Sequence, residues 1–307
     1  MVAALRHEST VMTTIHRFIA KYPATAYFAL TFAISWGGAL LAIGGSGGMS
    51  GTAPTDDPRF VYALLAMLAG PSLSGILLTA LVHGRNALPE LLSRVLEWRV
   101  ATRWYAVAIL AAPFLWIATL FALSLTSPRF LPALLTSQDK ASLVLVGLAV
   151  AVGAGVFEEL GWTGFAIPQI RRRHGLFTTG LIVGVLWGAW HLLTNVLWAA
   201  PVSAGELPLS IFLPVSVLGT LAGYLAPFRV LMVWVYDRTR SVFVAILMHA
   251  SITGSVLILD PAAISGTAAL TYSFAWAAAV WAAVAVVALA NGWHRARRPA
   301  RGERLAA

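Results

Sequence analysis

The sequence predicts an all-α, polytopic membrane protein in which about eight transmembrane helices form a single bundle. Hydrophobic residues make up 59% of the chain and charged residues only 11%, whereas about a quarter of a soluble domain is charged. The apolar residues gather in segments of roughly 20, the length that an α-helix needs to cross the hydrocarbon core of a bilayer. Most of the arginines lie between these segments, where a membrane protein meets water.

Eight candidate spans follow one another along the chain, at residues 23–44, 60–82, 103–126, 141–168, 176–200, 209–235, 242–259 and 270–291. The second contains Gly70-Pro71 near its middle, and we expect a kink there because proline removes a helical hydrogen bond. Between the second and third spans, residues 86–103 place leucines at helical spacing among charged side chains. This pattern predicts a short amphipathic helix that lies in the membrane interface.

The domain organisation is predicted to be simple, with one transmembrane domain at residues 23–291 between two polar tails. Residues 1–22 are expected to be a polar cytoplasmic N-terminus and residues 292–307 a basic cytoplasmic tail. The N-terminal stretch lacks a compact apolar core followed by a cleavage signal, so we expect the first span to act as the insertion signal. The absence of cysteine excludes disulfides and thiolate metal sites.

The distribution of basic residues predicts a multi-pass protein of the cell membrane with both termini in the cytoplasm. Every second connection is rich in arginine, and the connections between them hold more acidic residues. Because positive charge is retained on the cytoplasmic side, this alternation fits an even number of spans. The formal charge of +9 is therefore interpreted as a topology signal. The expected partners are the lipid bilayer and a peptide or membrane-protein substrate, and no nucleic acid.

Four ionisable residues lie inside predicted spans: Glu158 and Glu159 in the fourth, His191 in the fifth and His249 in the seventh. A carboxylate in hydrocarbon is costly, so an intramembrane pair indicates function. At about 1.5 Å rise per residue, all four can reach one layer near the midplane. Carboxylate and imidazole groups can bind a divalent metal or deprotonate a water. Together with an oxyanion donor such as His249, assisted by Thr253 one turn later, they suit peptide-bond hydrolysis.

Other interpretations fit parts of this pattern. A pair of membrane glutamates is also typical of a proton-coupled transporter, and each histidine alone could serve as a hydrogen-bonding residue between helices. A catalytically inactive membrane scaffold of the same fold is a third alternative. Trp187 is expected to serve packing or the interface belt.

Three short motifs in order resemble a known family. Glu158-Glu159 followed by Trp162-Thr163-Gly164, then Trp187-x-x-x-His191, then His249-x-x-x-Thr253, are similar to the motifs of the CAAX protease and bacteriocin-processing (abortive-infection-like) intramembrane proteases, which are type II CAAX prenyl endopeptidase-like. The resemblance covers about residues 141–259 and implies an eight-helix bundle with a conical active-site cavity.

By this resemblance, Glu158 and His191 would activate a water, Glu159 would support the site, and His249 with Thr253 would stabilise the oxyanion. The same resemblance leaves a second mechanism open, in which Glu158, His191 and His249 hold a divalent metal such as Zn²⁺.

Two positions depart from the family pattern: Thr163 stands where the family has arginine, and Thr253 where it has asparagine. The first departure removes the usual cation one turn after Glu159. Arg229, inside the sixth span, could supply the missing cation. Because a long arginine side chain can reach the headgroups, however, we expect Arg229 to snorkel to the cytoplasmic surface and not to pair with a glutamate.

Overall fold

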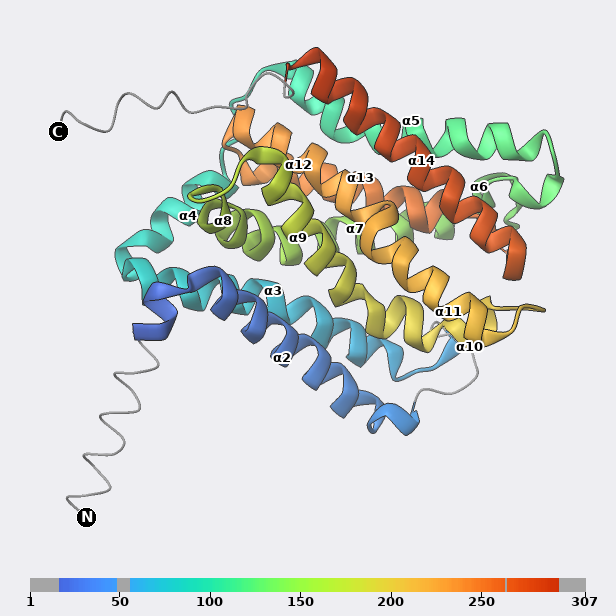
Figure 1. Cartoon of the computed structure of the whole chain (residues 1–307), viewed down its shortest axis with the longest axis horizontal. Helices are drawn as coiled ribbons and strands as arrows, with labels where there is room; N and C mark the ends of the chain where they lie inside the picture. Colours follow the sequence, from blue (N-terminus) through green and yellow to red (C-terminus); the bar gives the residue numbers. More distant parts are fainter. Residues whose placement is uncertain (1–16, 49–55, 263, 293–307) are drawn as a thin grey trace.

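The protein is described here by a computed structural model that covers residues 17–48, 56–262 and 264–292 (Figure 1). Over these residues every regular element is helical and none is a strand. Eight helical segments are long and apolar enough to cross a membrane, and all eight correspond to predicted spans. The all-α, polytopic fold class is therefore confirmed. Most of the expected polar tails, residues 1–16 and 293–307, lies outside the described residues.

The spans differ in their regularity. Five are single helices: α2 (Pro23–Ile43), α3 (Phe60–His83), α5 (Thr102–Ser124), α13 (Val242–Leu259) and α14 (Gly266–Ala290). Three are composite: α7 (Lys140–Gly161) with η5 (Trp162–Ala166) and α8 (Ile167–Arg171); α9 (Leu176–His191) with η6 (Leu192–Trp198); and α11 (Leu209–Leu218) with η7 (Gly219–Gly223) and α12 (Leu225–Thr239). Short connecting helices are η1 (Ser46–Gly48), η3 (Arg85–Ala87), α4 (Leu88–Val95), η4 (Pro128–Phe130), α6 (Ala133–Thr136) and α10 (Ala200–Ser203).

The composite spans are interrupted by π-helical turns at η5, η6 and η7, where the sequence predicted continuous helices. A π-helical turn closes its hydrogen bonds one residue later than an α-helix and is common at functional sites. Two of the three begin close to the residues that were predicted to carry chemistry. The turn η5 starts three residues after Glu159, and η6 starts directly after His191.

Helix packing brings the polar residues of different spans together. The helix α2 packs on α3, α9 packs on α12, and α13 packs against both α7 and α5 (Figure 1). The helices α7 and α13 approach closely because Gly155 faces the backbone of α13. A Cβ at Gly155 would lie 2.7 Å from the carbonyl oxygen of Ile246. This close approach sets the end of α7, with Glu158 and Glu159, against the middle of α13.

One end of the bundle carries the short helix that the sequence predicted between the second and third spans. This helix is α4, which buries Leu91 and exposes Leu92, as an amphipathic helix should. In Figure 1 it lies beside α8, at the opposite end of the molecule from α10 and α11. At the same end an ion pair of 2.7 Å between Arg171 and Asp237 joins α8 to α12.

Candidate active site

A buried ion pair lies at the centre of the bundle. The Nη1 atom of Arg229 on α12 donates to both carboxylate oxygens of Glu159 on α7, at 2.8 and 2.9 Å. Both side chains are completely buried. The hydroxyl of Thr163, one turn after Glu159, donates to the Oε2 atom of the same carboxylate. Glu159 therefore accepts hydrogen bonds from one cation and one hydroxyl, and its side chain has no exposed surface.

The snorkelling expected of Arg229 is wrong. Its guanidinium turns inward to Glu159 and does not reach the headgroup level near Arg238. The physical reason is that Thr163 leaves the Glu159 carboxylate without a cation from its own helix, and an unpaired buried charge is far costlier than a paired one. Arg229 thus supplies Glu159 with a cation from a different helix.

The guanidinium of Arg229 is held from a second side by an aromatic ring. Its Cζ atom lies 4.1 Å from the ring centroid of Trp187 on α9, a distance at which the negative face of the ring attracts a cation. The Nε and Nη2 atoms of Arg229 have no hydrogen-bond partner among the described residues. The stacking on Trp187 therefore compensates part of the cost of burying this charge.

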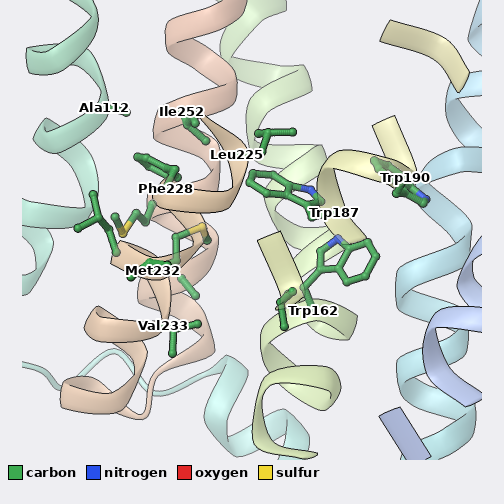
Figure 2. Close-up of a cluster of buried hydrophobic side chains, with 14 of the residues drawn as sticks. Ala112, Trp162, Trp187, Trp190, Leu225, Phe228, Met232, Val233 and Ile252 are labelled. Carbon is green, nitrogen blue, oxygen red and sulfur yellow. The ribbon is translucent and has the colours of Figure 1, made fainter. Parts of the chain in front are cut away.

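Glu158 occupies a different environment from its neighbour. Its Oε2 atom accepts hydrogen bonds from two indole nitrogens, Trp187 at 2.8 Å and Trp162 at 3.2 Å. Figure 2 shows these two rings with their nitrogen atoms turned toward the same space. No arginine or lysine pairs with Glu158 among the described residues, and its side chain is only 4% exposed. The second carboxylate thus relies on neutral donors alone.

His249 on α13 lies between the two carboxylates. Its Nδ1 atom is 2.7 Å from Oε1 of Glu159, and its Nε2 atom is 3.7 Å from Oε1 of Glu158. An ionised carboxylate only accepts hydrogen bonds, so the short contact requires a proton on Nδ1. The longer contact exceeds a direct hydrogen bond. Glu158 and His249, which the sequence predicted to share a site, are therefore brought together.

His191 lies at the edge of this group. Its Nδ1 atom is 2.9 Å from the carbonyl oxygen of Trp187, one turn earlier on α9. Its ring packs against the rings of Trp187 and Trp190, with centroid distances of 5.4 and 4.7 Å. Among the described residues, no ring nitrogen of His191 forms an ion pair within 4 Å of a carboxylate oxygen of Glu158 or Glu159. The half-buried His191 is joined to the other site residues through Trp187.

Trp187 contacts four of the candidate site residues, although the sequence suggested only a packing or interface role for it. Its indole nitrogen binds Glu158 and its ring contacts Arg229 and His191, as described above. The same ring lies 5.1 Å from the ring of His249. The signal was present in the spacing, because Trp187 precedes His191 by one helical turn, just as Trp162 follows Glu158 by one turn.

Thr253, the predicted assistant of His249, takes no part in the hydrogen bonds just described. Its side chain is half-buried one turn after His249. It forms no side-chain hydrogen bond with another described residue. Its assignment to the site remains a prediction from the motif.

The predicted metal ligands do not form a metal-binding group in this arrangement. No set of three or more His, Cys, Asp or Glu side chains in the described ranges is placed to hold a metal ion. Each of the two histidines uses Nδ1 within the protein, and only Nε2 of His249 points toward Glu158. The described side chains thus form a hydrogen-bonded network, in which the three predicted ligands are not gathered into one metal-binding group.

A cavity of about 580 Å³ lies between α11, η7, α13 and α14. Its lining includes none of Glu158, His191 and His249. It does include Asn195, which follows His191 by one helical turn. The cavity also contains Asp260, which follows α13 and accepts hydrogen bonds from the side chains of Trp116 and Tyr272. Burial raises the pKa of Asp260 to about 7.

Comparison with known proteins agrees with the motifs. Residues 140–255 match the family model described as type II CAAX prenyl endopeptidase Rce1-like. A protein named CAAX prenyl protease 2 from Methanococcus maripaludis is 42% identical over 38 residues, which are 12% of this chain and 14% of that protein. The match to that relative thus spans much less than two thirds of its length. The matched segment 140–255 includes the glutamate pair, both histidines and the buried arginine, so the similarity to the Rce1-like type II CAAX prenyl endopeptidases falls on the candidate site.

Proposed function

We propose that this protein is a CAAX-type intramembrane endopeptidase, which hydrolyses a peptide bond in or near the bilayer. The observation that carries the proposal is the position of His249 between the carboxylates of Glu158 and Glu159, deep in a bundle of apolar helices. The family match at residues 140–255 supports the same general class of enzyme.

His191 would hold the attacking water. A backbone carbonyl can only accept a hydrogen bond, so the 2.9 Å contact with Trp187 assigns the proton of neutral His191 to Nδ1. The Nε2 atom then carries a lone pair that can accept a hydrogen bond from the water. The ring also packs edge-on against Trp187 and Trp190. This packing would keep the lone pair in one direction while substrate binds.

Glu158 would act as the general base. Its Oε2 atom is taken up by two indole N–H groups, whereas Oε1 has only the long 3.7 Å contact with His249. A water beside this gap could reach both Oε1 of Glu158 and Nε2 of His249 within hydrogen-bonding distance. Glu158 would take the proton as the water attacks the carbonyl carbon, and would then deliver it to the nitrogen of the departing amine.

His249 would stabilise the oxyanion. Because Nδ1 donates to Glu159, His249 can donate from Nε2 only as an imidazolium. Glu159, itself held by Arg229, would orient this donor without touching the substrate. The substrate would be a peptide or membrane protein whose cleavage site enters the bundle from the bilayer.

Reconstitution into liposomes tests the proposed function against its alternatives. Purified protein is mixed with membrane peptides, products are identified by mass spectrometry, and a pH-sensitive dye inside the liposomes reports proton flux. We expect peptide cleavage by the wild type and its loss in His191→Ala, because the water is no longer held. Proton flux without cleavage would support the transporter, and neither activity would support the scaffold; each result would overturn the protease proposal.

A further inference from the structure

A second group of polar side chains lies outside the candidate active site, at the end of the bundle that carries α4. It is an open pocket of about 490 Å³, here called the arginine pocket, with a lining of Ser93, Arg94, Glu97, Arg99, Thr239 and Arg240. These residues come from two parts of the chain that are about 140 positions apart: α4 with the residues after it, and the end of α12 with the turn that follows it.

Two hydrogen bonds join the two parts of the arginine pocket. The hydroxyl of Ser241 donates to the backbone carbonyl of Glu97, and Nη1 of Arg94 donates to the hydroxyl oxygen of Tyr236 at 3.0 Å. Arg240 adopts a left-handed backbone conformation with φ of 55°, which is rare for a residue other than glycine. The pocket is therefore set by tertiary contacts and is more than a run of basic residues along the chain.

The arginine pocket carries an excess of positive charge. Within the described parts of the chain, Arg94, Arg99 and Arg240 form no ion pair, whereas the three arginines at positions 59, 171 and 229 each pair with an acidic side chain. The one carboxylate in the lining, Glu97, accepts a hydrogen bond from the backbone N–H of Arg99 at 2.9 Å. Three guanidinium groups against one carboxylate leave a site that suits an anion.

Exposed apolar side chains beside the pocket indicate its depth in the membrane. Leu92, Leu96 and Trp98 are 56%, 63% and 61% exposed, and they lie on α4 and on the chain that follows it. Tryptophan prefers the headgroup level of a bilayer. The guanidinium of Arg99 lies 5.4 Å from the ring centroid of Trp98. The arginines would therefore lie at the level of lipid phosphates, with apolar surface directly beneath.

We propose that the arginine pocket binds the headgroup of an anionic phospholipid such as phosphatidylglycerol. The lipid phosphate would accept hydrogen bonds from the guanidinium groups of Arg99 and Arg240, and its acyl chains would lie on the exposed leucines of α4. A free phosphate would satisfy the arginines but would leave those leucines uncovered. Phosphatidylcholine would bring a positively charged choline group into a site that already carries excess positive charge.

The test measures lipid retention by native mass spectrometry after purification from nanodiscs that contain equal amounts of phosphatidylglycerol and phosphatidylcholine. The double variant Arg99→Gln/Arg240→Gln should lose the selectively retained phosphatidylglycerol, with an affinity about thirtyfold weaker, or roughly fivefold for each arginine. The matched control is Arg172→Gln/Arg173→Gln, which removes the same charge from exposed positions in another turn. This control should keep the lipid.

A second variant and a second ligand complete the test. Ser93→Asp adds a negative charge to the pocket while keeping every arginine, and it should also lose phosphatidylglycerol. Equal loss in the two double variants would show general surface attraction and would overturn the proposal. The melting temperature of the detergent-solubilised protein is also measured with phosphatidylglycerol and with inorganic phosphate. If inorganic phosphate alone raised it as much as the lipid does, the assignment to a lipid would be overturned. Unchanged thermal stability of the variants in phosphatidylcholine nanodiscs would confirm that they are folded.

Discussion

At the scale of single residues, we expect the buried ion pair of Glu159 and Arg229 to have a large effect on the free energy of unfolding. Removing one partner of a buried ion pair leaves an uncompensated charge and typically costs about 3–5 kcal/mol. Arg229→Met keeps an unbranched apolar side chain on α12 but leaves Glu159 without its cation. We expect a large fall in the apparent melting temperature in detergent. An unchanged melting temperature would contradict the central place of this ion pair.

Thr163→Arg restores the family residue and would be expected to help if the chain lacked a cation. Because Arg229 already pairs with Glu159 and Thr163 is completely buried, a second guanidinium should instead destabilise the wild type. In the background of Arg229→Met the same change should recover most of the lost stability, since it supplies the cation from α7. Thermal unfolding of the two single variants and the double variant measures this coupling, and simple additivity of the two losses would contradict it.

Asp260 should give the stability of the protein a dependence on pH near neutrality. Burial raises its folded pKa to about 7, above the unfolded value, so the folded state binds more protons between the two values. Its contribution to stability is therefore present at low pH and is lost as the pH rises toward 7. Asp260→Asn, which can still accept from Trp116 and Tyr272, should flatten this dependence. The measurement is the difference in melting temperature between the two proteins at pH 5 and pH 8.

Among the single residues of the site, some could be predicted from the sequence and others could not. The motifs identified Glu158, Glu159 and His249, because an ionisable residue within an apolar span is conspicuous in any sequence. They did not assign the partner of Glu159, since Arg229 lies 70 positions away and only packing of α9 against α12 decides whether it turns inward. Trp187 was missed for a similar reason, because nothing in the sequence separates an indole that donates to a carboxylate from one that only packs.

At the scale of elements, the contact between α9 and α12 positions Arg229. A Cβ added at Gly184 would lie 2.5 Å from the Cα of Ala226 and 3.0 Å from the Cβ of Arg229. Gly184→Ala should therefore separate the two helices, lower the melting temperature and weaken the ion pair. Gly153→Ala on α7 is the matched control, because its Cβ would meet nothing within 4 Å. Equal effects of the two substitutions would mean that close helix packing does not hold the site.

The spans themselves were the easiest elements to predict, because length and hydrophobicity alone define them. The π-helical turns were not predicted. An i→i+5 turn has no distinct amino-acid composition. It forms where packing against neighbouring helices stabilises it by more than the loss of an α-helical hydrogen bond costs. The turn η5 is an example, since all five of its residues are buried.

At the scale of the whole molecule, the eight candidate spans within the described residues predict that both ends of the chain lie on the same side of the membrane. The arginine-rich connections predict that this side is the cytoplasm. A phosphatase reporter that is active only in the periplasm, fused after residue 307, should give no signal, while a cytoplasmic fluorescent reporter there should. The opposite pair of signals would reverse the orientation.

The proposed peptidase mechanism depends on Glu158 acting as a general base within a folded bundle. The most direct measurement is the rate of peptide cleavage by Glu158→Gln in liposomes, because this change keeps the size of the side chain and leaves an oxygen that can accept the indole hydrogen bonds. Glu206→Gln, at an exposed position, is the control. We expect a loss of at least about 10²–10⁴-fold, the usual contribution of a general base, with normal folding and normal activity of the control. Cleavage by Glu158→Gln at the wild-type rate would contradict the account.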